Sequence, residues 1–169
     1  MQIDAGSVLL RDEVAADGPF LFELYASTRK EELDSWGWPP EMRKPFLELQ
    51  FRAQQSYRAA FPRAEFRVLE LNRQPIGRIV VDRGQDEIRL VDLALLPKFR
   101  NHGIGTALLR ALSTEAAAAK KPLRLNVLKG NRAANLYLRL GFSKARETAT
   151  HDEMEWRGTN TWEPVRHKK

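Results

Sequence analysis

A glycine-bearing turn between a strand and a helix constrains the fold of this chain most. The apolar run from Ile88 to Leu96 is predicted to be a strand, and it ends at Pro97. Arg100-Asn101-His102-Gly103-Ile104-Gly105 follows and opens a segment with apolar residues on one helical face. The free N–H groups from Asn101 to Thr106 would converge at the positive end of that helix, and the glycines allow close approach. The turn is therefore predicted to bind an anion, with Arg100 adding charge-assisted hydrogen bonds.

The two glycines have three other possible interpretations. A dinucleotide-binding turn requires a third glycine where Leu108 stands, and a triphosphate loop requires G-x-x-x-x-G-K-[ST], which the segment lacks. A tight turn with no ligand satisfies the glycines equally well. The residues of the turn alone leave that possibility open.

The order of predicted elements indicates a mixed α/β domain. Trp36-Gly37-Trp38-Pro39-Pro40 must separate the first helix from the second, because prolines and glycine break helices. A single domain is expected over residues 1–158, followed by a polar tail at 159–169. The predicted elements are a strand at 7–11, a helix from Pro19, a second helix ending before Phe61, strands at 66–71, 76–82 and 88–96, a helix from Ile104, a strand at 123–128, a helix from Asn131 to Gly141 and a strand at 154–156.

Composition excludes several classes of protein. The 169 residues include no cysteine and no apolar run of 18 or more, so neither thiolate chemistry nor a membrane span is expected. The N-terminus lacks a secretory signal, and a cytoplasmic location is expected. The net charge is +6, but the arginines are scattered among 22 acidic residues, which argues against a nucleic-acid partner. No His/Asp/Glu group has the spacing of metal ligands, so no metal is expected.

A second motif gives the glycine turn a context. Asn131, Ala134, Leu136, Tyr137, Gly141 and Phe142 follow about two dozen residues after Arg100-x-x-Gly103-x-Gly105. Together the two stretches resemble the signatures of the GNAT superfamily of N-acetyltransferases, whose first signature is R/Q-x-x-G-x-G/A. The element order is similar from about Ser7 to Trp156, and the motifs themselves lie between Leu90 and Phe142.

The resemblance implies a fold and a cofactor. The fold is α/β (α+β), with a mixed, mostly antiparallel central sheet flanked by helices and a V-shaped split between its fourth and fifth strands. The split receives the pantetheine arm of acetyl-CoA, and coenzyme A is the product. The residues implied to bind the cofactor are Leu93, Ala94, Leu95, Arg100, Asn101, His102, Gly103, Ile104, Gly105, Thr106, Asn126, Asn131, Ala134 and Tyr137.

The resemblance also implies catalytic roles. Tyr137 is the expected general acid, because a phenol stays protonated at neutral pH and can donate to the leaving thiolate. Many relatives carry a glutamate base where Asn126 stands, and an amide is not a useful base. Asp92 is the expected alternative, since strand alternation places it on one face with Ala94. Glu87 and Glu70, a water relay, or an acceptor amine of low pKa are further options.

The acceptor is expected to be a small-molecule or peptide amine. In the family, the first two helices and their connecting loop help to form its site, which points here to Glu32, Trp36, Trp38 and Tyr57. A Trp-Pro loop that merely covers the core is the alternative, and His151 is a further candidate. A catalytically silent acyl-CoA-binding module is the second hypothesis for function, and both a monomer and a homodimer are compatible with the sequence.

Overall fold

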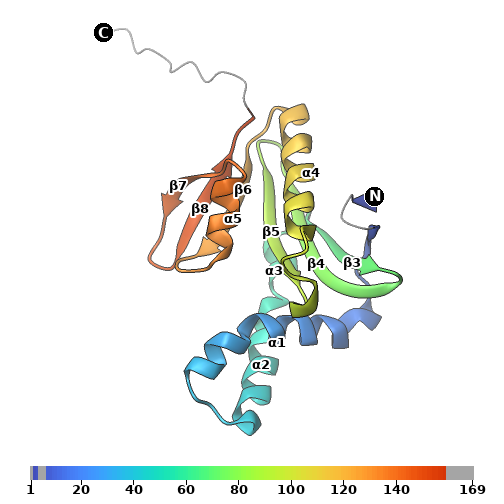
Figure 1. Cartoon of the computed structure of the whole chain (residues 1–169), viewed down its shortest axis with the longest axis vertical. Helices are drawn as coiled ribbons and strands as arrows, with labels where there is room; N and C mark the ends of the chain where they lie inside the picture. The colour runs from blue at the N-terminus through green and yellow to red at the C-terminus, as the bar shows by residue number, and fades with distance from the viewer. Residues whose placement is uncertain (1, 4–6, 159–169) are drawn as a thin grey trace.

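The fold is built on one mixed sheet in a computed structural model, which describes residues 2–3 and 7–158 (Figure 1). The strands lie in the order β1-β2-β3-β4-β5-β6-β8-β7, and only β5 and β6 pair in parallel. Their bounds are β1 Gln2–Ile3, β2 Val8–Asp12, β3 Glu65–Leu71, β4 Gln74–Arg83, β5 Ile88–Leu95, β6 Leu123–Leu128, β7 Ser143–Glu147 and β8 His151–Trp156.

The helices lie on both sides of this sheet. Figure 1 shows α4 and α5 over one face, and α1 and α2 gathered at the lower end. Their bounds are α1 Gly18–Ser35, α2 Pro40–Gln54, α3 Tyr57–Ala60, α4 Ile104–Ala119 and α5 Ala133–Arg139, with 3-10 turns at Ala15–Asp17 and Pro97–Phe99. None of the described helices has the length and apolar character that crossing a membrane requires. The predicted mixed α/β architecture is confirmed.

The core lies between the sheet and α4. Alternate residues of β6, such as Leu123 and Leu125, point into it, and so does the apolar stripe of α4 around Leu109. The alternating apolar residues of β6 therefore pack against the apolar stripe of α4, as the sequence predicts. Lys120 ends α4 in a left-handed conformation before Pro122, and Gly141, at φ +91°, follows α5.

The sheet divides between β5 and β6. Only three residue pairs join these strands, from Ile88↔Leu123 to Leu90↔Leu125. Beyond them β5 stays paired with β4 alone, and β6 with β8 alone. Just past that point β5 carries a bulge, because Val81 pairs with Leu90 and Val80 with Asp92, which leaves Val91 without a partner. The V-shaped split, expected between the fourth and fifth predicted strands, is confirmed here.

Three elements differ from the sequence-based expectation. The second helix is broken after Gln54, and Tyr57–Ala60 forms a separate turn of helix. β1 adds a two-residue pairing ahead of the first predicted strand. β7 lacks the alternation that would reveal a strand, because all five of its residues are exposed at the edge of the sheet. The polar tail predicted at 159–169 lies outside the described residues.

Gly77 on β4 permits the close approach of β5 beside the split. Gly77 pairs with Leu95, and a Cβ atom at Gly77 would lie 2.4 Å from the Ala94 carbonyl oxygen and 2.7 Å from Leu95 Cδ2. The first of these atoms belongs to the backbone and cannot rotate away. A side chain at this position must therefore displace the end of β5.

The Gly77→Ala variant is expected to lower the free energy of unfolding by about 1–3 kcal/mol, the usual cost of overpacking. Chemical denaturation of the purified variant measures this. Gly18→Ala is the matched control, since a Cβ atom there meets nothing within 4 Å. Equal stability of the two variants would show that β5 moves freely and that Gly77 does not set its position.

Candidate functional site

The C-terminal half of β5 has one open edge. The Leu96 N–H donates to the Ile76 carbonyl on β4 at 2.9 Å. Because N–H directions alternate along a strand, the peptide groups of Leu93 and Leu95 point the other way, into the split from β6. Ala94 turns its side chain toward α1. The expected pantetheine-binding stretch, Leu93 to Leu95, thus presents backbone donors and acceptors at the split.

The N-terminus of α4 is open where the anion site was predicted. Gly103 precedes the helix at φ +82°, and Asn101 also has a positive φ of 61°. Among the described residues no side chain caps this end, so the first-turn N–H groups at Ile104, Gly105 and Thr106 have no intrahelical acceptors. His102 is exposed in the same loop. The geometry is that of an anion-binding helix terminus.

Arg100, predicted to contact the cofactor, is hydrogen-bonded within the protein. Its Nε donates to the Leu95 carbonyl oxygen at 2.8 Å, and its guanidinium also contacts the Ser27 hydroxyl at 3.3 Å. The side chain therefore holds the glycine loop against the end of β5 and against α1. Its charge lies beside the split, but its principal hydrogen bond is to the protein backbone.

Residues of the second motif lie on the other side of the split. Asn131 Oδ1 accepts a hydrogen bond from the Ala133 N–H at 2.9 Å, so the side chain acts as the predicted helix cap. Ala134 and Tyr137 pack against the core cluster, and the Tyr137 ring lies 5.7 Å from that of Phe142. Burial raises the pKa of the Tyr137 phenol, and the Asp92 carboxylate raises it further. The phenol and Asp92 are thus electrostatic neighbours, although they come from α5 and β5.

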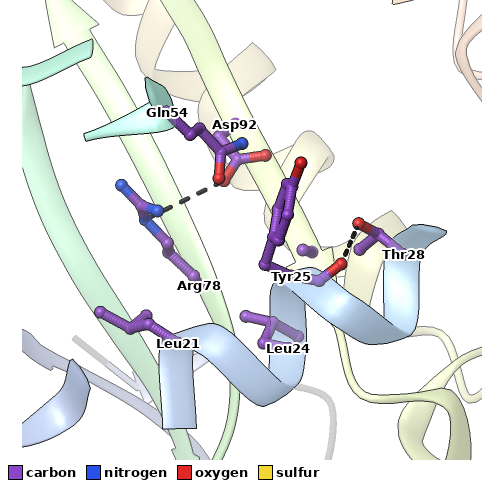
Figure 2. Close-up of a pocket in the computed structure, with 8 residues that line it drawn as sticks. Leu21, Leu24, Tyr25, Thr28, Gln54, Arg78 and Asp92 are labelled. Carbon is purple, nitrogen blue, oxygen red and sulfur yellow. Dashed lines mark hydrogen bonds and ion pairs between the residues drawn. The ribbon is translucent and has the colours of Figure 1, made fainter. Parts of the chain in front are cut away.

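Asp92 lies in a small recess on the α1 side of β5 (Figure 2). The recess has a volume of about 30 Å³, close to the space of one water molecule, and is lined by Leu21, Leu24, Tyr25, Thr28, Gln54, Arg78, Asp92 and Ala94. Burial raises the pKa of the Asp92 carboxyl, the Arg78 charge and the Leu93 amide oppose that rise, and the Glu13 charge adds to it. A carboxyl whose pKa is raised in this way is suited to accept a proton.

Arg78 connects Asp92 to a buried group of charges. Its Nε lies 3.9 Å from Asp92 Oδ2 and 3.4 Å from Glu13 Oε2, and the Arg78 and Glu13 side chains are 9% and 5% exposed. Arg58 of α3 also binds Glu13, and its guanidinium lies 4.1 Å from the centroid of the Phe66 ring. Charges of alternating sign therefore run from α3 to the recess and hold Asp92 in place.

A larger cavity, of about 390 Å³, lies beside the split. Its residues come from β5, β6, β8, the β7–β8 hairpin and the segment before β3: Phe61, Arg89, Leu90, Val91, Asn126, Arg146, Thr148, His151 and Glu153. Asn126 is directly opposite Glu153 in the β6–β8 pairing, so the two side chains share a face. That face is the one away from α4, because the alternate residues Leu125 and Val127 are in the core. The volume is that of a ligand site.

The residues expected to bind the acceptor amine are elsewhere. Trp36 and Trp38 pack at a tilt against each other and edge-to-face against Phe46, with ring centroids 5.1 to 6.0 Å apart. Glu32 pairs with Arg29 on α1. These side chains line neither cavity and hold the α1–α2 turn together, which is the alternative that the sequence left open. The side chain of Tyr57 lies outside the described part of the chain, so its predicted role stays a prediction.

The comparisons with known proteins agree with this architecture. Residues 62–144 match the family model described as "Acetyltransferase (GNAT) domain". This chain contains a GNAT acetyltransferase domain.

Solved structures similar to the GNAT domain share its whole fold. PaiA N-acetyltransferase from Thermoplasma acidophilum, in complex with coenzyme A, has a TM-score of 0.67 at 19% identity, over 90% of this chain and 99% of that one. An acetyltransferase from Thermus thermophilus has a TM-score of 0.66 at 19% identity, over 93% and 99%. A GNAT family acetyltransferase from Elizabethkingia anophelis with acetyl-CoA bound has a TM-score of 0.56 at 16% identity, over 89% and 97%. No curated protein sequence matches the chain.

Sequence reasoning missed several polar residues of the GNAT domain. Arg78 carries a signal that could have revealed it, since it is the one charge within the apolar run Ile76 to Val81. Glu153 and Arg89 carry none, because cross-strand neighbours depend on register that one sequence does not give. Among the described residues, no group of three or more His, Asp and Glu side chains could hold a metal ion.

Replacing Arg78 by Met in the GNAT domain is expected to raise the pKa of Asp92 further, because an opposite charge is lost. NMR titration of the aspartate carboxyl carbons measures this. Arg78→Lys keeps the positive charge and is expected to keep most of the wild-type value. An unchanged Asp92 pKa in the folded Met variant would show that the 3.9 Å ion pair does not tune this carboxyl.

Proposed function

We propose that this chain is an N-acetyltransferase that moves the acetyl group of acetyl-CoA to a primary amine by direct attack within a ternary complex. The observation that carries the proposal is the placement of a phenol and a partly buried carboxyl, each with a raised pKa, beside the split in the sheet. General acid and base catalysis needs two such groups around one reacting centre.

The proposed cofactor fits the open groups of the site. The pyrophosphate of acetyl-CoA is a dianion that the uncapped N-terminus of α4 suits, and Gly103 keeps the approach clear, since nothing lies within 4 Å of a Cβ atom built there. The pantetheine amides match the peptide groups of Leu93 and Leu95 that face the split, of which the Leu95 carbonyl is shared with Arg100 and the Leu93 amide with Asp92. The amide N–H near Leu95 is a donor to the thioester carbonyl oxygen as negative charge develops on it. Two structural neighbours are in complex with coenzyme A or acetyl-CoA, which supports the same ligand here.

In the proposed reaction the lone pair of a neutral amine attacks the thioester carbonyl carbon and forms the C–N bond. Asp92 accepts the proton that the nitrogen loses, either directly or through a water held in the recess beside Arg78. The C–S bond then breaks, its electron pair leaves with sulfur, and Tyr137 donates a proton to the thiolate. Proton transfer from Asp92 to Tyr137 through solvent restores both groups.

The second candidate is an acyl-CoA-binding module without chemistry. It is supported by Asn126, which stands where many relatives carry a glutamate, and by the absence of a carboxylate base on β6 at that position. Release of free thiol from acetyl-CoA in the presence of amines separates the two candidates. Amine-dependent release supports the enzyme, and binding without release supports the module.

Isothermal titration calorimetry is expected to show saturable binding of acetyl-CoA at about 1 mM or below. Gly103→Ala is expected to weaken that binding about tenfold, since a Cβ atom strains the left-handed backbone and occupies the anion approach. Gly37→Ala is the control, because Gly37 also has a positive φ, of 66°, with nothing within 4 Å of its Cβ position. Equal affinity of both variants would remove the α4 terminus as the pyrophosphate site.

The Tyr137→Phe variant is expected to lower kcat by about 10²- to 10⁴-fold while acetyl-CoA affinity stays close to wild type. In the wild-type enzyme the rate is expected to rise with pH through an Asp92 pKa above its ordinary value and to fall where Tyr137 loses its proton, above the ordinary phenol value. Pre-steady-state pH profiles measure both limbs. Retention of the alkaline limb and of kcat in the Phe variant would exclude Tyr137 as the acid.

A further inference from the structure

The charges around the larger cavity indicate which class of amine it receives. We propose that the cavity binds an amine acceptor that also carries an anionic group, a carboxylate or a phosphate, and that Arg146 selects for this group. The proposal rests on the proposed acetyl transfer and names its substrate class. It begins from the position of the cavity, which includes Leu90 and Val91 of β5 at the point where β5 leaves β6.

The cavity carries an excess of positive charge. Its lining contains Arg89 and Arg146 against the single carboxylate of Glu153. Arg89 donates to Glu153 at 3.2 Å and to Glu87 at 2.7 Å, so its charge is matched within the sheet. Arg146 contacts Glu153 only at 3.6 Å, and its side chain is 74% exposed. Arg146 therefore has donors left for an anion that enters the cavity.

Glu87, Glu153 and Glu155 lie on the same face and are already occupied, because each forms ion pairs with two arginines. Glu87 is bound by Arg89 and Arg124, Glu153 lies between Arg89 and Arg146, and Glu155 is bound by Arg124 and Arg157. A polycation such as a polyamine needs unpaired carboxylates, and on this face it would have to displace arginines. An acceptor with one amine and one anion avoids that cost.

Two further residues at the edge of the cavity bear on the preference for an anionic group. Thr148 and His151 lie in the β7–β8 hairpin beside Arg146, and both contribute to the lining. The Thr148 hydroxyl already donates to the His151 carbonyl at 3.2 Å, and His151 Nδ1 lies 2.8 Å from the Thr150 hydroxyl. The other ring nitrogen of His151, Nε2, can donate to a carboxylate or phosphate together with the guanidinium. The amine then lies toward Val91 and the split, and the anion lies toward the hairpin. Phe61, also in the lining, provides an apolar surface for the carbon atoms between the two groups.

The test compares amines that differ only in the anion. β-Alanine is paired with propylamine, and O-phosphoethanolamine with ethanolamine, while spermidine represents polycations. Thiol release from acetyl-CoA gives kcat/KM for each compound. For at least one pair, kcat/KM of the anionic member is expected to exceed that of its neutral partner by about tenfold. This difference is expected to decrease at high ionic strength. The two pairs distinguish carboxylate from phosphate.

Arg146→Gln is expected to lower kcat/KM for the preferred anionic amine about fivefold to tenfold and to leave the neutral partner unchanged. Arg157→Gln is the matched control, since Arg157 is an exposed arginine paired with Glu155 and does not line the cavity. A preference for spermidine, or equal effects of the two substitutions, would overturn the proposal.

Binding measurements test the anion site independently of turnover. NMR titration of the protein saturated with coenzyme A follows the amide signals of the hairpin as each amine is added. Shifts produced by the anionic amine and lost in the Arg146→Gln variant support the anion site even if no acetyl transfer occurs, in which case only the proposed function fails. Acetyl transfer to amines without any dependence on charge would leave the proposed function intact and refute the anion site.

Discussion

The short parallel pairing of β5 with β6 is the constraint on which the rest of the structure depends. Three residue pairs hold the two halves of the sheet together, and the unpaired remainder of each strand leaves peptide groups without partners. Unpaired backbone groups inside a protein are costly unless something else binds them. Here the Leu95 carbonyl oxygen accepts a hydrogen bond from Arg100. The other unpaired peptide groups of β5 face the split, where a ligand with amides along its length can form hydrogen bonds to them.

The bulge at Val91 determines which side chain lies beside that opening. Without the extra residue, strand alternation would turn the side chain of Asp92 toward α4 and into the apolar core. With it, Asp92 faces α1 and reaches Arg78 on the neighbouring strand. The inserted residue, Val91, therefore lies where β5 leaves β6, and it also turns the Asp92 carboxylate into the recess. The buried Arg78 is tolerated because Glu13 and Asp92 balance its charge from two directions.

The sequence predicted those parts of the molecule that local patterns encode. The glycine turn, α4 with its lysine end, and the Asn131 cap each depend on residues within a few positions of one another, and each is found as expected. The polar cavity could not be predicted, because Asn126 and Glu153 become neighbours only through the register of β6 and β8. Trp36 and Trp38 were predicted to bind the acceptor because of their aromatic character, and that role stays a prediction. Their contact with Phe46, ten and eight residues further along, could not be read from the sequence.

In the proposed acetyl transfer the two cavities have different roles, which follow from their size. A recess of about 30 Å³ beside Asp92 is too small for any amine larger than ammonia, so its polar lining suits a water or the carboxylate alone. A cavity of about 390 Å³ on the same face of the sheet has room for a whole amine. Val91 and Asp92 are consecutive on β5, and each belongs to a different cavity. In the proposed reaction the bulge therefore places Asp92 next to the cavity for the amine. Its carboxyl group stays in a separate, more enclosed environment, where burial raises its pKa while it can still accept a proton.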